Sequence, residues 1–157
     1  MVNTLPMGNS MATLEDAILL TVQAHQGQKD KAGAPYVLHP LRVMLCMRSD
    51  IEMMVAVLHD VVEDTPYTLP DLQRAGYPEQ VLEALDRLTR RQNETYEEFI
   101  ERVKANPLAR KVKIADLEDN MDIRRISDLQ EKDMERLKRY RRAWSALTGE
   151  TVQGDAA

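Results

Sequence analysis

One histidine and three acidic residues stand close together in residues 56–65, which read Ala-Val-Leu-His-Asp-Val-Val-Glu-Asp-Thr. If this segment is helical, His59 lies over Glu63 and Asp60 over Asp64, because residues four apart share a helix face. Such a ridge could bind a metal ion or move a proton. Burying so much charge among Val and Leu is costly unless a cation or substrate compensates for it. The alternative interpretation is an amphipathic helix whose polar stripe is acidic.

The chain has three histidines, so imidazole ligands for a metal must come from His25, His39 and His59. His39 precedes Pro40, and a histidine in that position is more often a helix cap than a ligand. We expect His25 to fix a loop through a hydrogen bond rather than to bind a metal. The histidines therefore permit a metal site without requiring one.

A further carboxylate, Asp116, follows the largely apolar run at residues 112–115, which places it at or beside a buried face. Asn120 comes one turn later on the same side of the expected helix. A buried aspartate is costly without a cation, and Lys113 and Arg124 are its candidate partners. A metal ion is the other candidate, so spacing alone leaves the site open.

Composition excludes several classes of protein. The 157 residues suit one domain with its own core, and 43% hydrophobic with 30% charged residues is an ordinary globular balance. A net charge of -5 gives no general attraction to nucleic acid or membrane. No apolar stretch reaches the roughly 20 residues that span a bilayer. We therefore expect a small-molecule partner and leave a homo-oligomer open.

The cysteine content and the first residues bear on the compartment. Cys46 is the only cysteine, which excludes an intramolecular disulfide and suits a reducing environment. Because Cys46 lies in an apolar run, we expect a buried structural thiol. The first residues lack the pattern of a signal peptide, so the cytoplasm is the expected location.

Helix signals recur along the chain, and no segment alternates with the period of two that a half-buried strand shows. Capping residues or prolines mark expected helix starts at Thr13, Pro40, Asp50, Thr68, Pro78, Thr95 and Asn106, and a last helix is expected over residues 131–147. The helix that begins at Asp50 should run through the His-Asp segment until Thr65-Pro66 ends it. These signals predict an all-α fold, a single bundle of about seven helices. Residues 1–12 are expected to be a flexible leader, with the first ten a candidate vector-derived addition, residues 13–149 the domain, and residues 150–157 a polar tail.

Four motifs follow one another along the chain: Ala24-His25-x-Gly27-Gln28, Gly33-x-Pro35-Tyr36-x-x-His39-Pro40, Leu58-His59-Asp60-x-x-Glu63-Asp64-Thr65 and Lys113-x-Ala115-Asp116-x-x-x-Asn120-Met121. Their order and wording resemble the HD-superfamily hydrolase domain of the RelA/SpoT alarmone enzymes, above all the small stand-alone alarmone hydrolases. The likeness runs from about residue 14 to residue 125. It implies an HD-domain helical bundle.

The resemblance also implies a role for each motif residue. The implied ligands of one divalent metal, typically manganese, are His39, His59, Asp60 and Asp116. Glu63 and Asp64 match the acids that position and activate water, while Lys31, Tyr36 and Asn120 match the substrate side of the pocket. The implied reaction removes the 3′-pyrophosphate of (p)ppGpp and releases GDP or GTP with pyrophosphate.

Three positions depart from the family pattern. Asp30 and Ala32 stand where the long alarmone enzymes usually have Arg and Ser, and Asp122 stands where Arg is usual. Arg124 and Arg125 are near enough in sequence to compensate for the arginine that is missing at position 122. The departures leave open the same chemistry on another nucleotide, (p)ppApp or the 2′-phosphate of NADPH. A catalytically silent nucleotide-binding module is a further alternative, but it should lack a ligand or an acid, and all six are present.

Overall fold

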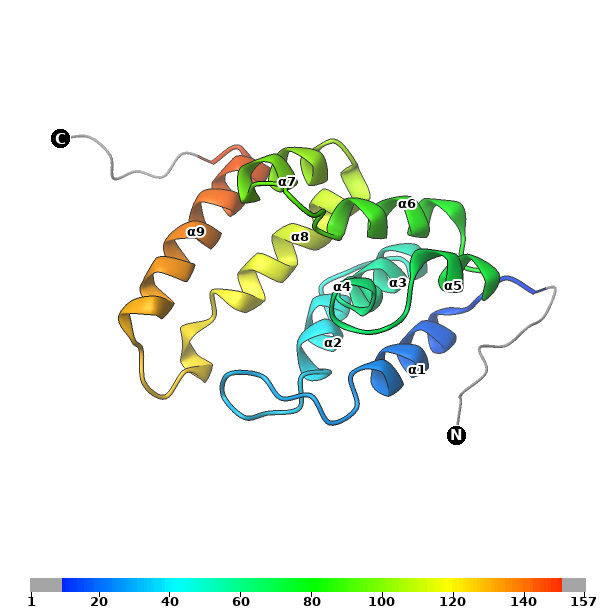
Figure 1. Ribbon diagram of the computed structural model, residues 1–157, viewed down its shortest axis with the longest axis horizontal. Helices are drawn as coiled ribbons and strands as arrows, with labels where there is room; N and C mark the ends of the chain where they lie inside the picture. Colours follow the sequence, from blue (N-terminus) through cyan, green and yellow to red (C-terminus); the bar gives the residue numbers. More distant parts are fainter. Residues whose placement is uncertain (1–9, 151–157) are drawn as a thin grey trace.

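Nine α-helices and one short 3-10 helix make up the part of the chain that the computed structural model describes, residues 10–150. They are α1 (Leu14–Ala24), α2 (Leu38–Leu45), α3 (Asp50–Leu58), α4 (Val61–Asp64), α5 (Leu69–Arg74), α6 (Glu79–Leu88), α7 (Tyr96–Lys104), α8 (Pro107–Asn120), η1 (Ile123–Arg125) and α9 (Glu131–Thr148). Within this range the only β-type pairing is one bridge between Lys29 and Pro35. The all-α prediction is confirmed (Figure 1).

Local sequence signals set most helix starts. The Thr68–Asp71 and Thr95–Glu98 capping boxes form as expected before α5 and α7. Helix α3 is capped by the hydroxyl of Ser49 rather than by Asp50, which becomes its first residue. Ala12, expected in a flexible leader, is buried, and its amide donates to the carbonyl of Gly76 at 3.0 Å. The expected leader at residues 1–9 and tail at residues 151–157 lie outside the described residues.

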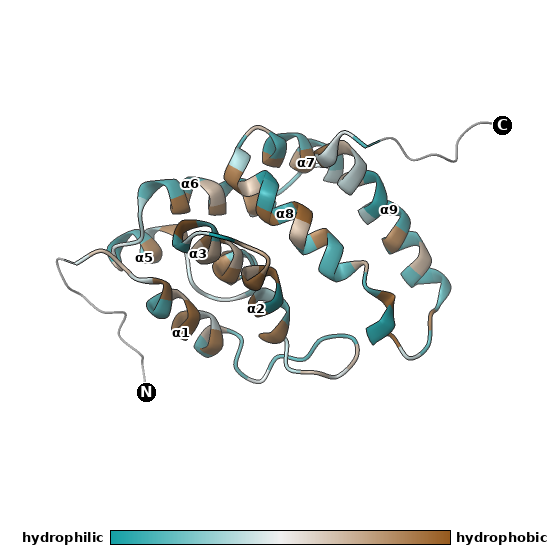
Figure 2. Cartoon of the chain, turned by 180° about the vertical axis from the view of Figure 1, so that it is seen from behind, coloured by the Kyte–Doolittle hydropathy of each residue, from teal (hydrophilic) through white to brown (hydrophobic). Residues whose placement is uncertain are grey.

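Helix α3 is the centre of the core and carries the site at its end. Residues 54–58 are all buried, and a helix that is apolar on every side must be surrounded by protein. Helices α1, α2, α6 and α8 contact it (Figure 1), and the hydropathy colouring marks its apolar surface (Figure 2). No helix in residues 10–150 has the length and apolar character needed to cross a membrane.

The expected continuous helix through the His-Asp segment is interrupted. Helix α3 ends at Leu58, and α4 begins only at Val61. The Nδ1 atom of His59 donates to the carbonyl of Ala56 at 2.6 Å, the carbonyl that the amide of Asp60 would use in an unbroken helix. The four side chains therefore do not form the uniform ridge that a continuous helix predicts. The side chain of His59 is buried, whereas those of Glu63 and Asp64 are exposed.

The expectation of a buried thiol is also wrong. Cys46 is free and exposed at the C-terminal end of α2. Its apolar neighbours Val43 and Met44 face the core, while Leu45 is 74% exposed. The apolar run thus continues past the face that α2 buries.

Candidate active site

Two histidines and two aspartates from three parts of the fold lie close together. One ligand atom each of His39, His59 and Asp60 lies within 4.8 Å of the others, and Asp116 adjoins both histidines. The Nε2 atom of His39, on α2, lies 3.0 Å from Oδ1 of Asp116, on α8, and 3.7 Å from Oδ2 of Asp60. The Nε2 atom of His59 lies 3.1 Å from Oδ2 of Asp60 and 3.5 Å from Oδ1 of Asp116. Ligands bound to one ion at about 2.0–2.2 Å are themselves separated by roughly 3–4 Å. The spacing fits a single metal ion.

The second ring nitrogen of each histidine is already engaged, which leaves Nε2 for a metal. His59 must carry its proton on Nδ1, since the carbonyl of Ala56 can only accept. Its Nε2 is buried and has no hydrogen-bond partner among residues 10–150. The Nδ1 atom of His39 lies 2.6 Å from Oδ2 of Asp119. Hydrogen bonds of this kind orient metal-binding histidines in known metal sites.

The charge balance of the cluster also favours a bound cation. Burial by itself lowers the pKa of His59, but the negative charges of Asp60 and Asp116 outweigh it and raise that pKa well above its ordinary value. Burial likewise opposes the shift at His39, whose pKa is raised by hydrogen bonds to Asp116 and Asp119. The pocket therefore attracts positive charge, and its imidazole and carboxylate donors are suitable ligands for a first-row divalent ion.

Asp116 is held from both sides by side chains of its own helix. Lys113 Nζ lies 2.7 Å from Oδ2, which confirms this candidate partner, and Asn120 Nδ2 lies 2.7 Å from Oδ1. Burial alone raises the pKa of Asp116, but the Lys113 charge and the histidines more than offset this, and the pKa falls well below its ordinary value. The prediction that Arg124 could pair with Asp116 is wrong, because Arg124 is 87% exposed and pairs with Asp122.

Glu63 and Asp64 lie on the solvent side of the cluster, in α4. Partial burial, followed by the negative charge of Asp60, raises the pKa of both carboxyl groups. His25 is buried nearby, and its Nδ1 lies 2.9 Å from the side-chain oxygen of Gln28, whose amide is 3.5 Å from the carbonyl of Asp64. This contact agrees with the expected loop-fixing role of His25.

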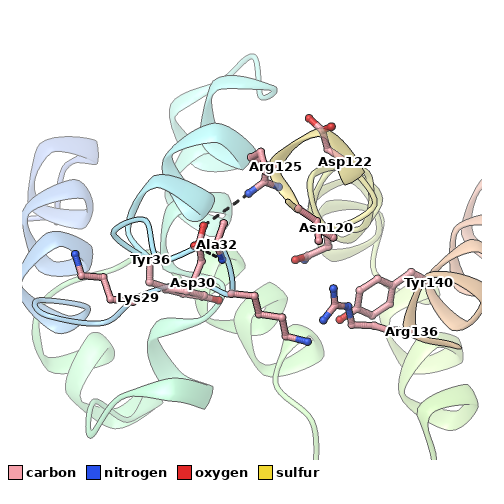
Figure 3. A pocket seen from close by; sticks show the side chains of 11 residues that line it. Lys29, Asp30, Ala32, Tyr36, Asn120, Asp122, Arg125, Arg136 and Tyr140 are labelled. Carbon is pink, nitrogen blue, oxygen red and sulfur yellow. Dashed lines mark hydrogen bonds and ion pairs between the residues drawn. The ribbon is translucent and has the colours of Figure 1, made fainter. Parts of the chain in front are cut away.

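A cavity of about 240 Å³ adjoins the cluster, and Lys31, Tyr36 and Asn120, the three residues expected on the substrate side, all line it. The Tyr36 hydroxyl donates to Oδ2 of Asp60, and Asn120 donates to Asp116. These two contacts connect the cavity wall with the candidate metal ligands. Figure 3 shows the side chains around this cavity.

Two cavity residues were not expected from the sequence. Arg136 and Tyr140 reach the cavity from α9, opposite the loop that carries Asp30 and Ala32 (Figure 3). The sequence offers a signal for Tyr140, because helical spacing puts it on the apolar side of the last helix. Spacing within one helix cannot reveal that Arg136 faces another element.

The unusual acid Asp30 has a structural partner and a local role. Its Oδ1 accepts the amides of Ala32 and Ala34, both at 2.9 Å, and thereby fixes the loop. Its Oδ2 lies 4.0 Å from the guanidinium group of Arg125 (Figure 3). Arg125 thus lies near the acid of the loop, a contact that was not expected from the sequence. Arg124, which together with Arg125 was expected to make up for the arginine missing at position 122, pairs with Asp122 itself.

Comparison with known proteins supports the resemblance seen in the motifs. The chain is 43% identical over 65 residues to the bifunctional (p)ppGpp synthase/hydrolase SpoT of Escherichia coli, covering 39% of this chain and 9% of that protein. It is 31% identical over 126 residues to a GTP pyrophosphokinase of Streptomyces coelicolor, covering 72% of this chain and 15% of the relative. The chain therefore spans less than a sixth of the length of these curated relatives. No protein-family model matches the chain.

A solved structure has the same fold. It is the structure of a metazoan ortholog of SpoT, a protein that hydrolyzes ppGpp and plays a role in starvation responses. The superposition has a TM-score of 0.72 at 22% sequence identity and covers 96% of this chain and 90% of the other. The expected helical architecture and the expected RelA/SpoT resemblance are both confirmed.

Proposed function

We propose that this chain, a relative of the RelA/SpoT enzymes, is a metal-dependent hydrolase that removes the 3′-pyrophosphate of (p)ppGpp and releases GDP or GTP with pyrophosphate. The observation that carries the proposal is the convergence of two imidazole and two carboxylate groups beside a cavity lined by basic side chains. The SpoT resemblance of the sequence supplies the substrate class. We assign residues 13–149 to the catalytic domain.

The chemistry divides between the buried cluster and the acids beside it. His39, His59, Asp60 and Asp116 would hold one divalent ion, which supplies a water of lowered pKa and polarises a phosphoryl oxygen. Glu63 accepts the proton of the attacking water, and Asp64 assists. The partial burial of Glu63 and the negative charge of Asp60 raise the pKa of Glu63, which makes its carboxylate a stronger base.

The cavity residues bind and orient the substrate. Lys31 offsets phosphate charge from the loop, and Arg136 does so from α9. Asn120 lies where cavity and cluster meet. Its Nδ2 donates to the carbonyl and to Oδ1 of Asp116, which leaves its Oδ1 to accept from the substrate. Tyr36 holds the Oδ2 atom of Asp60 in place and presents its ring to the cavity.

The remaining assignments follow from the donor set and the composition. We propose Mn²⁺ as the ion, because the resemblance to the RelA/SpoT enzymes implies it and the mixed imidazole and carboxylate donor set is compatible with it. We propose the cytoplasm as the location, since the single cysteine is free and exposed, as in a reducing compartment. The partner is a small nucleotide rather than a nucleic acid, given the net charge of -5.

A substrate panel tests the proposal. The protein is stripped with a chelator, reloaded with Mn²⁺, and incubated separately with ppGpp, ppApp, NADPH and nucleoside triphosphates. We expect pyrophosphate release from ppGpp that requires Mn²⁺ and is abolished by Asp60→Ala. Turnover of only ppApp or NADPH would overturn the substrate assignment. Turnover without metal, or none on the whole panel, would overturn the enzymatic function.

A further inference from the structure

Asp119 lies at the centre of an ion network behind the metal cluster. Its Oδ2 is 2.6 Å from Nδ1 of His39, the nitrogen that faces away from the other ligands. Arg42, one turn after His39 on α2, contacts both carboxylate oxygens, with Nε at 2.7 Å from Oδ1 and Nη2 at 3.0 Å from Oδ2. Arg125 Nη2 is 3.1 Å from Oδ2. Asp119 is only 13% exposed, so water competes weakly for these contacts.

The two histidines of the cluster are oriented by different partners. His59 donates to the neutral carbonyl of Ala56, a contact made within its own turn of the chain. His39 is instead held by a carboxylate from α8, 80 residues away in sequence. A carboxylate fixes the proton on Nδ1, sets the ring plane, and makes Nε2 a more basic donor. Charge-assisted hydrogen bonds of this type are also roughly twice as strong as neutral ones.

The two arginines restrict where the Asp119 carboxylate can lie. Arg42 engages it through two parallel N–H···O contacts, a geometry that resists rotation of the carboxylate. Two guanidinium groups thus face the carboxylate, and both can only donate hydrogen bonds. The same carboxylate faces Nδ1 of His39, from which it can accept.

We propose that Asp119 is a positioning residue for the metal ligand His39, with its carboxylate clamped by Arg42 and Arg125. The inference deepens the proposed function and rests on its metal site. Arg125 also lines the substrate cavity and faces Asp30 of the loop. Arg125 thus connects Asp119, behind the candidate metal cluster, with the wall of the substrate cavity.

The experiment measures Mn²⁺ binding to the full chain by titration calorimetry, without substrate. We expect Asp119→Ala to weaken Mn²⁺ binding about 10- to 100-fold, the usual range for losing such a partner. Asp119→Asn should lose less, because its amide oxygen can still accept from Nδ1. The matched control is Glu118→Gln on the same helix, where Glu118 accepts from Trp144 Nε1 at 2.9 Å; its affinity should equal that of the wild type.

Two further readouts separate positioning from a merely structural role. In the Zn²⁺-loaded protein, the Nδ1 proton of His39 should give a slowly exchanging NMR signal that Asp119→Ala abolishes. The melting temperature of the metal-free variants reports folding independently of metal. Equal Mn²⁺ affinity of wild type and Asp119→Ala, or a loss explained by unfolding, would overturn this inference alone. A wild type that binds no Mn²⁺ would overturn the proposed function, and this inference with it.

Discussion

Side chains of opposite exposure share the site. His59 and Asp116 are buried and already fixed by hydrogen bonds, as metal ligands must be if they are to hold an ion in one geometry. Glu63 and Asp64 reach solvent, and in the described residues neither is part of the group of His39, His59 and Asp60 that could hold an ion. A general base needs access to water rather than a fixed place on the metal. The exposure of each pair therefore matches the role proposed for it.

This division of roles predicts the behaviour of Glu63→Gln. The amide has the size of the carboxylate but cannot accept the proton, so kcat should fall about 10²- to 10⁴-fold. Affinity for Mn²⁺, measured by calorimetry, should stay at the wild-type value because Glu63 is not a ligand. Glu83→Gln, an exposed change on α6, serves as the control for both measurements. If Glu63→Gln loses the metal, Glu63 is a ligand and the base lies elsewhere.

The candidate metal ligands stand in motifs that the sequence shows. The side chains that hydrogen-bond to these candidate ligands were only partly predictable from the sequence. His59, Asp60 and Asp116 stand in recognisable motifs, and Lys113 shares a helix turn with Asp116. Asp119 gave no signal of its own, because its partners are Arg42 on α2 and Arg125 beyond α8. Contacts between elements depend on how the helices pack, which spacing within one helix does not reveal.

Arg102 fastens the loop between α6 and α7. Its guanidinium group makes two contacts to Glu94, with Nε at 2.7 Å from Oε1 and Nη2 at 2.9 Å from Oε2. It also donates to the carbonyls of Asp86, Arg87 and Thr89 at the end of α6, which have no further helical turn to accept from. One side chain thus satisfies both a helix end and an acid of the loop.

Removing this side chain should destabilise the protein. Arg102→Ala leaves several carbonyls and Glu94 without their partner, and we expect a loss of about 2–3 kcal/mol in the free energy of unfolding. Arg102→Lys should recover only part of this, since an ammonium group cannot make the two parallel contacts. Urea denaturation measures both, with the exposed Arg142→Ala on α9 as the control. If Arg102→Ala has the same free energy of unfolding as the wild type, water replaces these contacts without a loss of stability.

The Glu94–Arg102 pair should also give a defined dependence on pH. The Arg102 hydrogen bonds lower the pKa of Glu94 from 4.5 to about 2. A lowered carboxyl pKa stabilises the folded state above about pH 4.5, and the contribution is lost as the pH falls toward about 2. The stability difference between wild type and Glu94→Gln should therefore shrink across this window. A difference that is constant from neutral pH down to the acid limit would contradict the assignment.

Elements with strong local signals were predictable, and those set by side-chain competition were not. The Thr68 and Thr95 capping boxes determine helix starts within four residues, so α5 and α7 begin where the sequence indicated. The break between α3 and α4 arises because His59 uses the carbonyl of Ala56. Apolar periodicity continues across this point, and it therefore favours one helix.

At the scale of the whole molecule, the candidate metal cluster joins segments that are distant in sequence. His39 comes from α2, His59 and Asp60 follow α3, and Asp116 belongs to α8. These helices pack around the same core, with α2 and α8 both in contact with α3 and with each other (Figure 1). An ion bound by all four side chains stabilises the folded state selectively, because the unfolded chain does not bring them together.

Bound metal should therefore raise the melting temperature. At a free Mn²⁺ concentration one hundred times the dissociation constant, the gain in the free energy of unfolding is about 2.7 kcal/mol. For a chain of this length, that corresponds to roughly 5–10 °C, measurable by differential scanning calorimetry with and without a chelator. Glu83→Gln, away from the cluster, should show the same shift as the wild type.

The variant that separates the site from other metal binding is His59→Ala. It removes one of the two imidazole groups and leaves Asp60 and Asp116 with less compensating charge, so the substitution also changes the stability of the metal-free protein. The informative quantity is accordingly the Mn²⁺-dependent shift, which should disappear. A shift of equal size in His59→Ala and wild type would mean that the ion binds outside the cluster and that the four converging side chains are held by their own ion pairs alone.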